Sequence, residues 1–278
     1  MTNDSLGDRM KGYEHVWKTK LPRRMPMIIR VDGKAFHTYT KNCQKPFDKR
    51  LADLMDETAR HLCENIQGAQ IAYIQSDEIT ILVHDYKSLN SEAWFDKELQ
   101  KMCSIAAAMA STYFSEHSWE LFYNDKTISE MEARNIFRKT ALFDARCFVL
   151  PEHDVVNNFI WRQQDAVRNS IQMLARSLYS HKECNNKNQA ALQEMCFQKG
   201  INWNDVPTGF KRGRCVYKQA TYISQEERMS ENDVVRNKWI IDTEIPIFTA
   251  DRDFVGKWLA VNKEVSALTG NQMLDEAE

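Results

Sequence analysis

The chain has 278 residues, of which 37 are basic and 39 acidic, so the formal net charge of −2 excludes a strong overall attraction to nucleic acid or membranes. No apolar run approaches the roughly 20 residues that cross a bilayer, and the polar N-terminus lacks the apolar core of a signal peptide. Seven scattered cysteines without a CxxC pair are typical of a reducing compartment. We therefore expect a soluble cytoplasmic protein without a membrane partner.

The predicted elements alternate between strands and helices. In chain order they are a strand over 27–31, a helix that starts after Asp48, strands over 70–75 and 79–83, a helix over 94–114 and a strand over 142–150. Asp48 can cap the first helix, and Gly68 ends it. The two middle strands flank Ser76-Asp77-Glu78 and should form a hairpin. This order is that of the ferredoxin-like split βαβ arrangement.

The second half of the chain is predicted to be mostly helical. Helices are expected over 154–180 and 187–199, short strands near 213–218 and 234–241, and a polar loop over 219–233. The fold class is therefore α+β, a palm of antiparallel sheet and packed helices with a mostly helical C-terminal part. We expect a catalytic palm over 1–150, an integrated helical part over 151–250 that binds the end of an RNA, and an extension over 251–278.

Two carboxylates carry the strongest chemical signal. Asp32 and Asp77 each follow an apolar run that reads as a buried strand, and the fold puts the ends of these strands side by side. Each alone could be an ordinary turn residue, since Asp-Gly is a common hairpin signal. As a pair, they suit Mg²⁺, which takes few carboxylates and leaves positions open for phosphate oxygens.

A turn that can hold phosphate follows the first of these carboxylates. The amides of 34–37 could cradle a triphosphate, and Gly33 would allow a close approach of the backbone. Four basic side chains follow within the next residues: Lys41, Lys45, Lys49 and Arg50. Positive charge at a helix N-terminus opposes the helix dipole, so phosphate binding is a plausible reason for the cluster.

A polar stripe interrupts the predicted helix over 154–180. Arg162, Asp165 and Asn169 have the i, i+3, i+7 spacing that puts them on one face. The stripe could be a solvent-exposed face with an Arg–Asp pair, or part of a binding site. Lys187 and the basic run 211–218 are further candidates for phosphate contact.

The motifs resemble, in sequence and in order, those of the tRNA(His) guanylyltransferase superfamily. They are RVDGKAFHTYTK (30–41), QKPFDKRLADLM (44–55), AYIQSDEITILV (72–83), FDAR (143–146), WRQQDAVRNS (161–170) and KNQ (187–189). The resemblance covers about residues 9–218, and the pairing of RVDGKAFH with QSDE is highly specific. WRQQDAVRNS is more similar to the guanylyltransferase-like branch that repairs tRNA 5′ ends.

The resemblance implies a polymerase that works in the 3′-to-5′ direction with two Mg²⁺ ions. The 3′-hydroxyl of an incoming nucleotide attacks the activated 5′ end of a tRNA. The implied substrates are GTP or other nucleoside triphosphates, with ATP or GTP for activation of the 5′ end. The family is typically a homotetramer, a dimer of dimers.

The resemblance also assigns residues. Asp32, the Gly33 carbonyl and Asp77 match the metal ligands, and Glu78 completes the catalytic acidic motif. The nucleotide-binding set is Asp32, Gly33, Lys34, Ala35, Phe36, His37, Lys45, Ser76 and Asp77. The set around the RNA 5′ end and its triphosphate is Arg146, Arg162, Asn169 and Lys187.

Two departures favour template-directed 5′-end repair. Val167 stands where the guanylyltransferases proper carry the histidine of a His-Ile-Asn-Asn sequence, and Ala145 replaces the glycine of Phe-Asp-Gly-Arg. The alternatives are a guanylyltransferase proper, which adds one G at position −1, and a palm-type nucleotide cyclase. A catalytically inactive RNA-binding protein is a third reading, against which the intact pair Asp32 and Asp77 argues.

Overall fold

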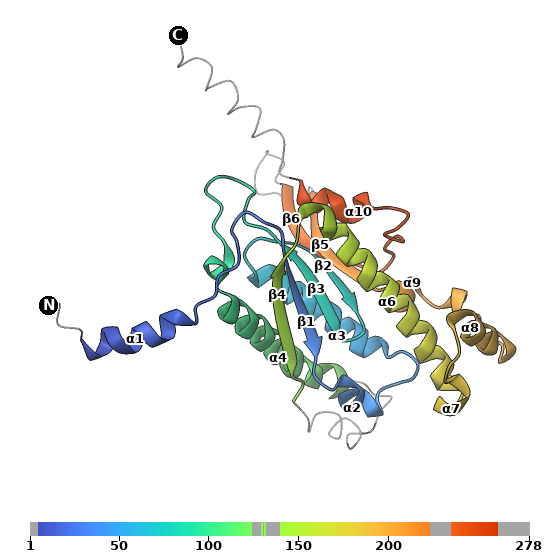
Figure 1. Cartoon of the computed structure of the whole chain (residues 1–278). Coiled ribbons are helices and arrows are strands. Elements are labelled where there is room, and N and C mark those ends of the chain that lie inside the picture. Colours follow the sequence, from blue (N-terminus) through green and yellow to red (C-terminus); the bar gives the residue numbers. More distant parts are fainter. Residues whose placement is uncertain (1–4, 124–128, 130, 132–139, 223–234, 261–278) are drawn as a thin grey trace, which may run out of the picture.

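A computed structural model of the chain describes residues 5–123, 129, 131, 140–222 and 235–260. Its centre is a six-stranded antiparallel sheet with the strand order β4-β1-β3-β2-β5-β6 (Figure 1). The strands are β1 Met27–Gly33, β2 Ala69–Gln75, β3 Glu78–Val83, β4 Phe143–Val149, β5 Arg214–Tyr222 and β6 Val235–Asp242. The first four have the order of a ferredoxin-like palm, so the predicted α+β fold is confirmed.

β5 and β6 extend the palm sheet beside β2. β5 pairs with β2 only from Arg214 to Tyr217, and beyond that point it pairs with β6 alone. Its side chains there, such as Lys218 and Gln219, are exposed, which explains why the sequence looks polar. The two predicted strands are confirmed, whereas the loop expected from residue 219 is wrong over 219–222. The rest of that loop, 223–233, lies outside the described residues.

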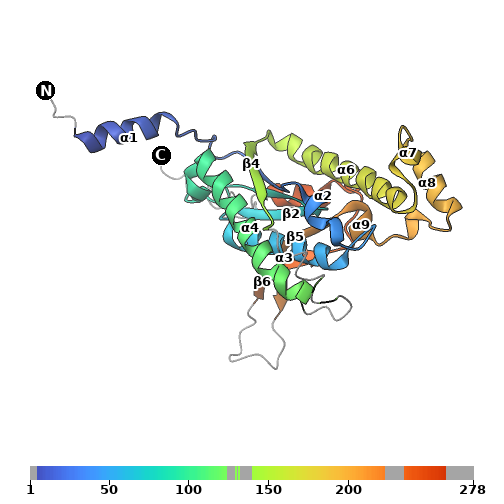
Figure 2. The ribbon, with the colours of Figure 1, turned by 90° about the horizontal axis from the view of Figure 1, so that it is seen from below.

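Two long helices, α3 (Lys49–Asn65) and α4 (Leu99–Tyr123), cover one face of the sheet (Figure 2). α3 is strongly amphipathic, and its apolar side chains pack on the strands. The Asp48 carboxylate accepts a hydrogen bond from the Arg50 amide, so the predicted N-cap is confirmed. The helix ends before Gly68, which has a φ of +84°.

α6 (Glu152–Leu178) crosses the other face of the sheet (Figure 2). Its first half buries Val155 and Phe159 against β-strand residues such as Ile28 and Tyr73. The short α10 (Asp253–Gly256) and the 3₁₀ turn η5 (Lys257–Leu259) close this core. Part of the predicted extension therefore packs against α6, and 261–278 lie outside the described residues.

The second half of α6 runs beyond the sheet and organises a smaller core. Ile171 and Leu174 of α6 pack against Leu192 and Cys196 of α8 (Gln189–Gln198). The short elements α7 (His181–Cys184), η3 (Trp203–Asp205) and α9 (Thr208–Arg212) complete this region (Figure 1).

The helix predicted over 94–114 begins later than expected. Trp94–Lys97 forms the 3₁₀ turn η2, in which Phe95 and Asp96 have positive φ angles, and α4 starts at Leu99. The reason is the buried ammonium group of Lys97, which lies 3.0 Å from the Asp85 carboxylate and donates to two backbone carbonyls of the segment before β1. A buried charge must be paired in this way, and satisfying it bends the chain out of helical geometry.

α1 (Leu6–Val16) projects away from the rest of the protein and buries none of its residues (Figure 1). In the part of the chain that the structure describes, no helix combines the length and the apolar character needed to span a bilayer.

A buried ion pair joins β5 to α3. Arg214 donates to the Asp56 carboxylate at 2.5 Å, and both residues are almost fully buried. We expect Arg214→Met to lower the free energy of unfolding by about 3 kcal/mol, because Asp56 would be left as an unpaired buried charge. Urea denaturation measures the loss. The double variant Asp56→Leu/Arg214→Met should regain most of it; if both variants were equally unstable, packing and not charge would explain the loss.

Candidate active site

The two predicted carboxylates meet where β1 ends and β2 turns into β3. Asp32 lies opposite Glu78 in the β1–β3 register, and the Gly33 amide donates to the Asp77 carbonyl at 3.1 Å. Ser76 holds the β2–β3 turn with a φ of +47°, a conformation that non-glycine residues rarely adopt. The sheet therefore fixes Asp32 and Asp77 side by side, as the sequence predicts.

The pair is short of positive charge. Burial, the largest cause, and three neighbouring carboxylates raise the pKa of Asp32 from its usual 3.8 to about 6. Those carboxylates belong to Asp77, Glu78 and Asp144, while Arg146 opposes them. Burial also raises the pKa of Asp77. Carboxylates that resist ionisation in this way gain from a bound cation.

Glu78 differs from its neighbours because it has its own cation. Arg162 of α6 grips it with two hydrogen bonds, Nε to Oε1 at 2.7 Å and a terminal nitrogen to Oε2 at 2.6 Å. Both side chains are about nine-tenths buried. The same guanidinium also contacts Asp165 at 2.9 Å. Arg162 therefore neutralises Glu78 and ties α6 to β3, while Asp32 and Asp77 form no ion pair with a described residue.

This donor set fits Mg²⁺. Two oxygen-donating carboxylates converge, and among the described residues no group of three or more His, Cys, Asp or Glu side chains could form a closed metal cage. Mg²⁺ is usually held by one or two carboxylates together with substrate phosphates and water, so a set of two acids suits it.

The carboxylates lie between two adjoining cavities. One, of about 740 Å³, extends over the turn after β1, and the other, of about 360 Å³, extends along α6. Both are lined by Asp32, Ser76 and Asp77. The two cavities thus form one cleft, and any groups bound in its two lobes would meet at the carboxylates.

The first lobe contains most of the predicted nucleotide-binding set. Its predicted members are Asp32, Gly33, Ala35, Phe36, His37, Lys45, Ser76 and Asp77. Lys34 does not line it, and the Lys34 amide is already bonded to the Leu142 carbonyl at 2.8 Å. The amides of Ala35, Phe36 and His37 make no hydrogen bond to described residues, so the expected backbone cradle is limited to these three.

Gly33 has a packing role in addition to the one expected. A Cβ atom there would lie 2.3 Å from the Phe36 ring, which is buried and packs on the glycine backbone. Phe36 opens the short helix α2 (Phe36–Tyr39), which continues into the 3₁₀ turn η1 (Thr40–Asn42). The missing side chain thus makes room for the ring that anchors the turn.

The second lobe contains the polar stripe of α6. Arg162, Asp165 and Asn169 line it, so these side chains do not form a simple solvent-exposed face. Lys187 lies in a neighbouring cavity of about 160 Å³, which shares Gln172 and Arg176 with this lobe. Arg146 is half-exposed on β4, where it contacts Asp144 at 3.3 Å on the flank of the cleft.

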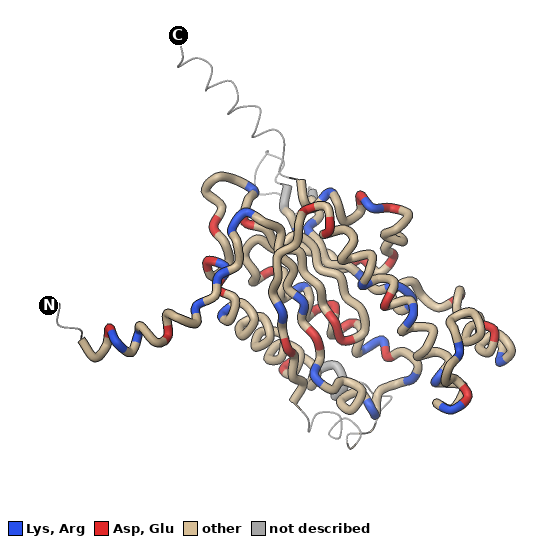
Figure 3. Tube along the Cα trace, in the orientation of Figure 1, with Lys and Arg blue, Asp and Glu red and all other residues tan. Residues whose placement is uncertain are grey.

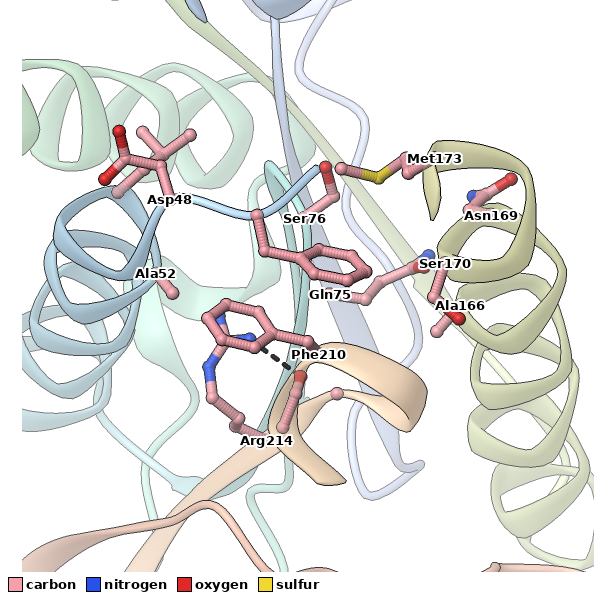
Figure 4. Close-up of a pocket in the computed structure, with 14 residues that line it drawn as sticks. Asp48, Ala52, Gln75, Ser76, Ala166, Asn169, Ser170, Met173, Phe210 and Arg214 are labelled. Atoms are coloured by element: carbon pink, nitrogen blue, oxygen red, sulfur yellow. Dashed lines mark hydrogen bonds between the residues drawn. The ribbon is translucent and has the colours of Figure 1, made fainter. Parts of the chain in front are cut away.

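A small recess opens beside the cleft (Figure 4). The Phe47 and Phe210 rings stack there with their centroids 4.9 Å apart. Gln75 and Arg214 line the recess, and each keeps one buried polar atom without a partner among the described residues. The residues that line the recess come from α3, α6, α9 and the β2–β3 turn. The contact between Phe47 and Phe210 therefore links the start of α3 to α9 beside the cleft.

Sequence reasoning missed Arg176, which lines both lobes and the Lys187 cavity. It follows Asn169 by seven residues and Arg162 by fourteen, so extending the helical stripe by two turns would have found it. Asp144 was also missed as a neighbour of Asp32; it lies opposite Asp32 in the β1–β4 register. Only the sheet order, which puts β4 beside β1, brings the two together.

The family model of tRNAHis guanylyltransferase matches residues 7–151. In sequence, the chain is 28% identical over 229 residues to an uncharacterized protein of Acanthamoeba polyphaga mimivirus, covering 78% of each chain. It is 27% identical over 224 residues to the tRNA(His) guanylyltransferase of Debaryomyces hansenii, covering 76% of this chain and 80% of the relative.

Solved structures give a higher similarity. A bacterial tRNA(His) guanylyltransferase-like protein in complex with ATP is 42% identical, with a TM-score of 0.79 over 93% of this chain and 100% of its own. Such a protein in complex with GTP is 41% identical, with a TM-score of 0.73 over 92% and 99%. The enzyme of Saccharomyces cerevisiae, at 21% identity over 81% and 95% and a TM-score of 0.60, shares the fold.

The chain therefore belongs to the tRNA(His) guanylyltransferase family and is a nucleotidyltransferase. The match covers its palm with Asp32 and Asp77, and the bacterial structures extend the similarity through α6 and beyond.

The raised pKa of Asp32 provides a test of the lack of positive charge around this carboxylate. A carboxyl whose folded pKa of about 6 exceeds its unfolded value destabilises the protein increasingly as pH rises through 6. Asp32→Asn should therefore stabilise the protein at pH 7.5 by about 1 kcal/mol, after discounting for partial exposure, and not at all below about pH 4. Urea denaturation at both pH values measures this.

The control for this experiment is Asp205→Asn, the same change at an exposed site. It should shift stability little at either pH. Added Mg²⁺ should narrow the difference between wild type and Asp32→Asn, because it binds the folded wild type. Equal stability of wild type and Asp32→Asn at pH 7.5 would contradict the conclusion that ionised Asp32 destabilises the protein.

Proposed function

We propose that the protein extends tRNA at its 5′ end in the 3′-to-5′ direction, as template-directed repair. The substrates are nucleoside triphosphates, and ATP or GTP activates the 5′ end. The observation that carries the proposal is the two-lobed cleft with Asp32 and Asp77 at the junction. A joining reaction needs two reactants that meet at one point, and two lobes with a shared centre provide that geometry.

Two Mg²⁺ ions bound by Asp32, the Gly33 carbonyl and Asp77 would stabilise charge on the attacking and leaving oxygens. In the first lobe, Lys45 and the amides of Ala35–His37 hold the phosphates of the incoming nucleotide and aim its 3′-hydroxyl.

In the second lobe, Asn169 and Arg176 hold the 5′ end of the RNA, with Lys187 in the adjoining cavity. Arg146 of β4, beside Asp144, contributes a further positive charge. The Glu78–Arg162 pair acts by position, because it locks α6 against the carboxylate-bearing strands. Attack of the 3′-hydroxyl on the activated 5′-phosphate forms the new P–O bond, and the activating group leaves.

The cleft suits selection of the incoming base by pairing. Its charged and amide groups point to phosphate binding, and pairing with the opposite RNA strand can align the 3′-hydroxyl without protein readout of the base. Val167, which replaces the family histidine, lies on the other side of α6 and packs in the α6–α8 core. The proposal of template-directed repair therefore depends more on the phosphate-binding groups of the cleft than on the presence of Val167 in place of the histidine.

Two further features extend the proposal. All seven cysteines are free thiols, which supports a cytoplasmic location that cell fractionation would test.

α1 and its C-cap residue expose an apolar stripe at i, i+4, i+7 and i+11, consisting of Leu6, Met10, Tyr13 and Trp17. Such a stripe fits the proposed homotetramer, a dimer of dimers, in which copies of α1 bury it.

The tetramer is tested by light scattering of the purified protein. Changing Met10 and Tyr13 to Glu should reduce the mass to that of a dimer or monomer, because charge would have to be buried in the α1 contact. The matched control changes Lys11 and His15, which are exposed on the opposite face of α1, to Gln, and it should keep the mass of the wild type. A wild-type monomer would refute the assembly.

The carboxylate roles are tested by substitution. Asp32→Ala and Asp77→Ala should each reduce nucleotide addition by at least about a thousandfold, because the metal ions would lose their anchors. Lys45→Ala, Arg146→Ala and Lys187→Ala should each weaken kcat/KM by the equivalent of about 1–3 kcal/mol, without a change in Mg²⁺ dependence. Near-normal turnover in a folded Asp variant would remove the metal assignment.

Template dependence separates repair from the alternatives. The test offers each of the four nucleotides to 5′-truncated tRNAs that carry each possible base opposite the missing position. We expect the added nucleotide to follow Watson–Crick pairing on several tRNAs. Addition of G alone, and only to tRNA(His), would establish a guanylyltransferase proper. A cyclic nucleotide without extended RNA would establish a cyclase, and RNA binding without either product an inactive binding protein.

A further inference from the structure

A separate cavity of about 520 Å³ lies on the side of α6 opposite the active-site cleft. It lies between α6, η3, α9 and the segment that follows β6. The cleft and this cavity share no lining residue. Its volume is within the range of small-molecule sites, about 300–1,000 Å³.

The lining of this cavity is basic. Arg168, Lys211 and Arg212 contribute to it, and no carboxylate does so among the described residues. Arg212 is a partly exposed residue of the lining, and its guanidinium has no hydrogen bond or ion pair with any described residue. A guanidinium in a cavity wall that has no anionic partner is available to bind a phosphate through charge-assisted hydrogen bonds.

The lining also suits a nucleobase. The Trp203 indole is held in place by its Nε1–H, which donates to the Ser170 hydroxyl at 3.1 Å. The side-chain amides of Gln164 and Asn204 line the same cavity and make no hydrogen bond to described residues. The Lys211 ammonium lies over this ring, 5.7 Å from its centroid. An aromatic ring in a cavity wall can stack on a base, and free amides can pair with base edges.

One carboxylate connects this cavity to the cleft. Asp165 accepts from Arg168 on the cavity side at 2.8 Å and from Arg162 on the cleft side at 2.9 Å. Only α6, about 10 Å across, separates the two sites. An RNA whose 5′ end lies in the cleft could therefore reach the cavity with its other strand.

We propose that this cavity binds one unpaired nucleotide of the RNA substrate, from the single-stranded 3′ tail of the strand opposite the 5′ end. The proposal rests on the proposed function, in that the 5′ end occupies the cleft. Arg212 holds the phosphate, and Trp203 with the free amides holds the base. A tail nucleotide bound there fixes the register of the template strand relative to Asp32 and Asp77.

The experiment measures RNA affinity by fluorescence anisotropy with the full chain carrying Asp32→Asn, so that no catalysis is required. The ligands are acceptor-stem duplexes with a recessed 5′ end, with or without the 3′ tail. A third duplex carries the same tail at its far end and so the same number of phosphates. The tail in its natural place should tighten binding about tenfold relative to both other duplexes.

Arg212→Gln and Trp203→Leu should reduce this tail effect to below about threefold and leave the affinity for the tailless duplex unchanged. The matched control is Arg60→Gln, which removes a guanidinium from the exposed side of α3, beyond the opposite face of the sheet. It should keep the full tail effect. Arg212→Gln removes no hydrogen bond or ion pair with a described residue, so it remains informative if Trp203→Leu is unstable.

Three results would overturn the proposal: no tail effect, a tail effect that is independent of the tail's position, or equal weakening of tailed and tailless RNA by Arg212→Gln. Saturable binding of free cytidine or adenosine monophosphate that Arg212→Gln abolishes, without a tail effect, would assign the cavity to a free nucleotide. Failure of the proposed function looks different, because nucleotide addition by the wild type would then be absent while the tail effect persists.

Discussion

The central constraint is an excess of negative charge where β1 ends and β3 begins. Antiparallel pairing brings Asp32 and Glu78 opposite each other and ties the Gly33 amide to Asp77. Arg162 compensates Glu78 alone, and burial with like charge raises the pKa of Asp32 to about 6. The fold thus maintains an arrangement that destabilises the free protein and that a cation with a phosphate would relieve.

α6 supplies one wall of the cleft that extends from these carboxylates. Its first half is anchored by the sheet core, and its second half extends beyond the sheet to hold α8 and the short elements around it. One face of the helix lines the cleft and another lines the basic cavity. Asp165 contacts an arginine on each side, so the geometry of one site is tied to that of the other by a single carboxylate.

The sequence predicted the palm because each strand and helix has a clear apolar pattern, and it predicted Asp32 and Asp77 because they follow such patterns. It could not predict that Lys97 would leave the helix, since that depends on pairing with Asp85 from a distant segment. It assigned Gly33 to ligand approach and did not indicate that the Phe36 ring packs against the same glycine. Contacts between distant segments, such as that of Asp56 with Arg214, cannot be predicted from the spacing of apolar residues within a helix or strand.

The two sides of α6 carry different kinds of side chain, and this difference suggests how the protein and base pairing share the selection of the nucleotide. The cleft presents cations and backbone amides, which recognise phosphate on any nucleotide. The cavity beyond α6 presents an indole and free amides, which can read a base. In the proposed reaction the protein would therefore not examine the incoming base. It would hold the opposite strand in register and leave the choice of nucleotide to base pairing, so that one rigid site could serve several template bases.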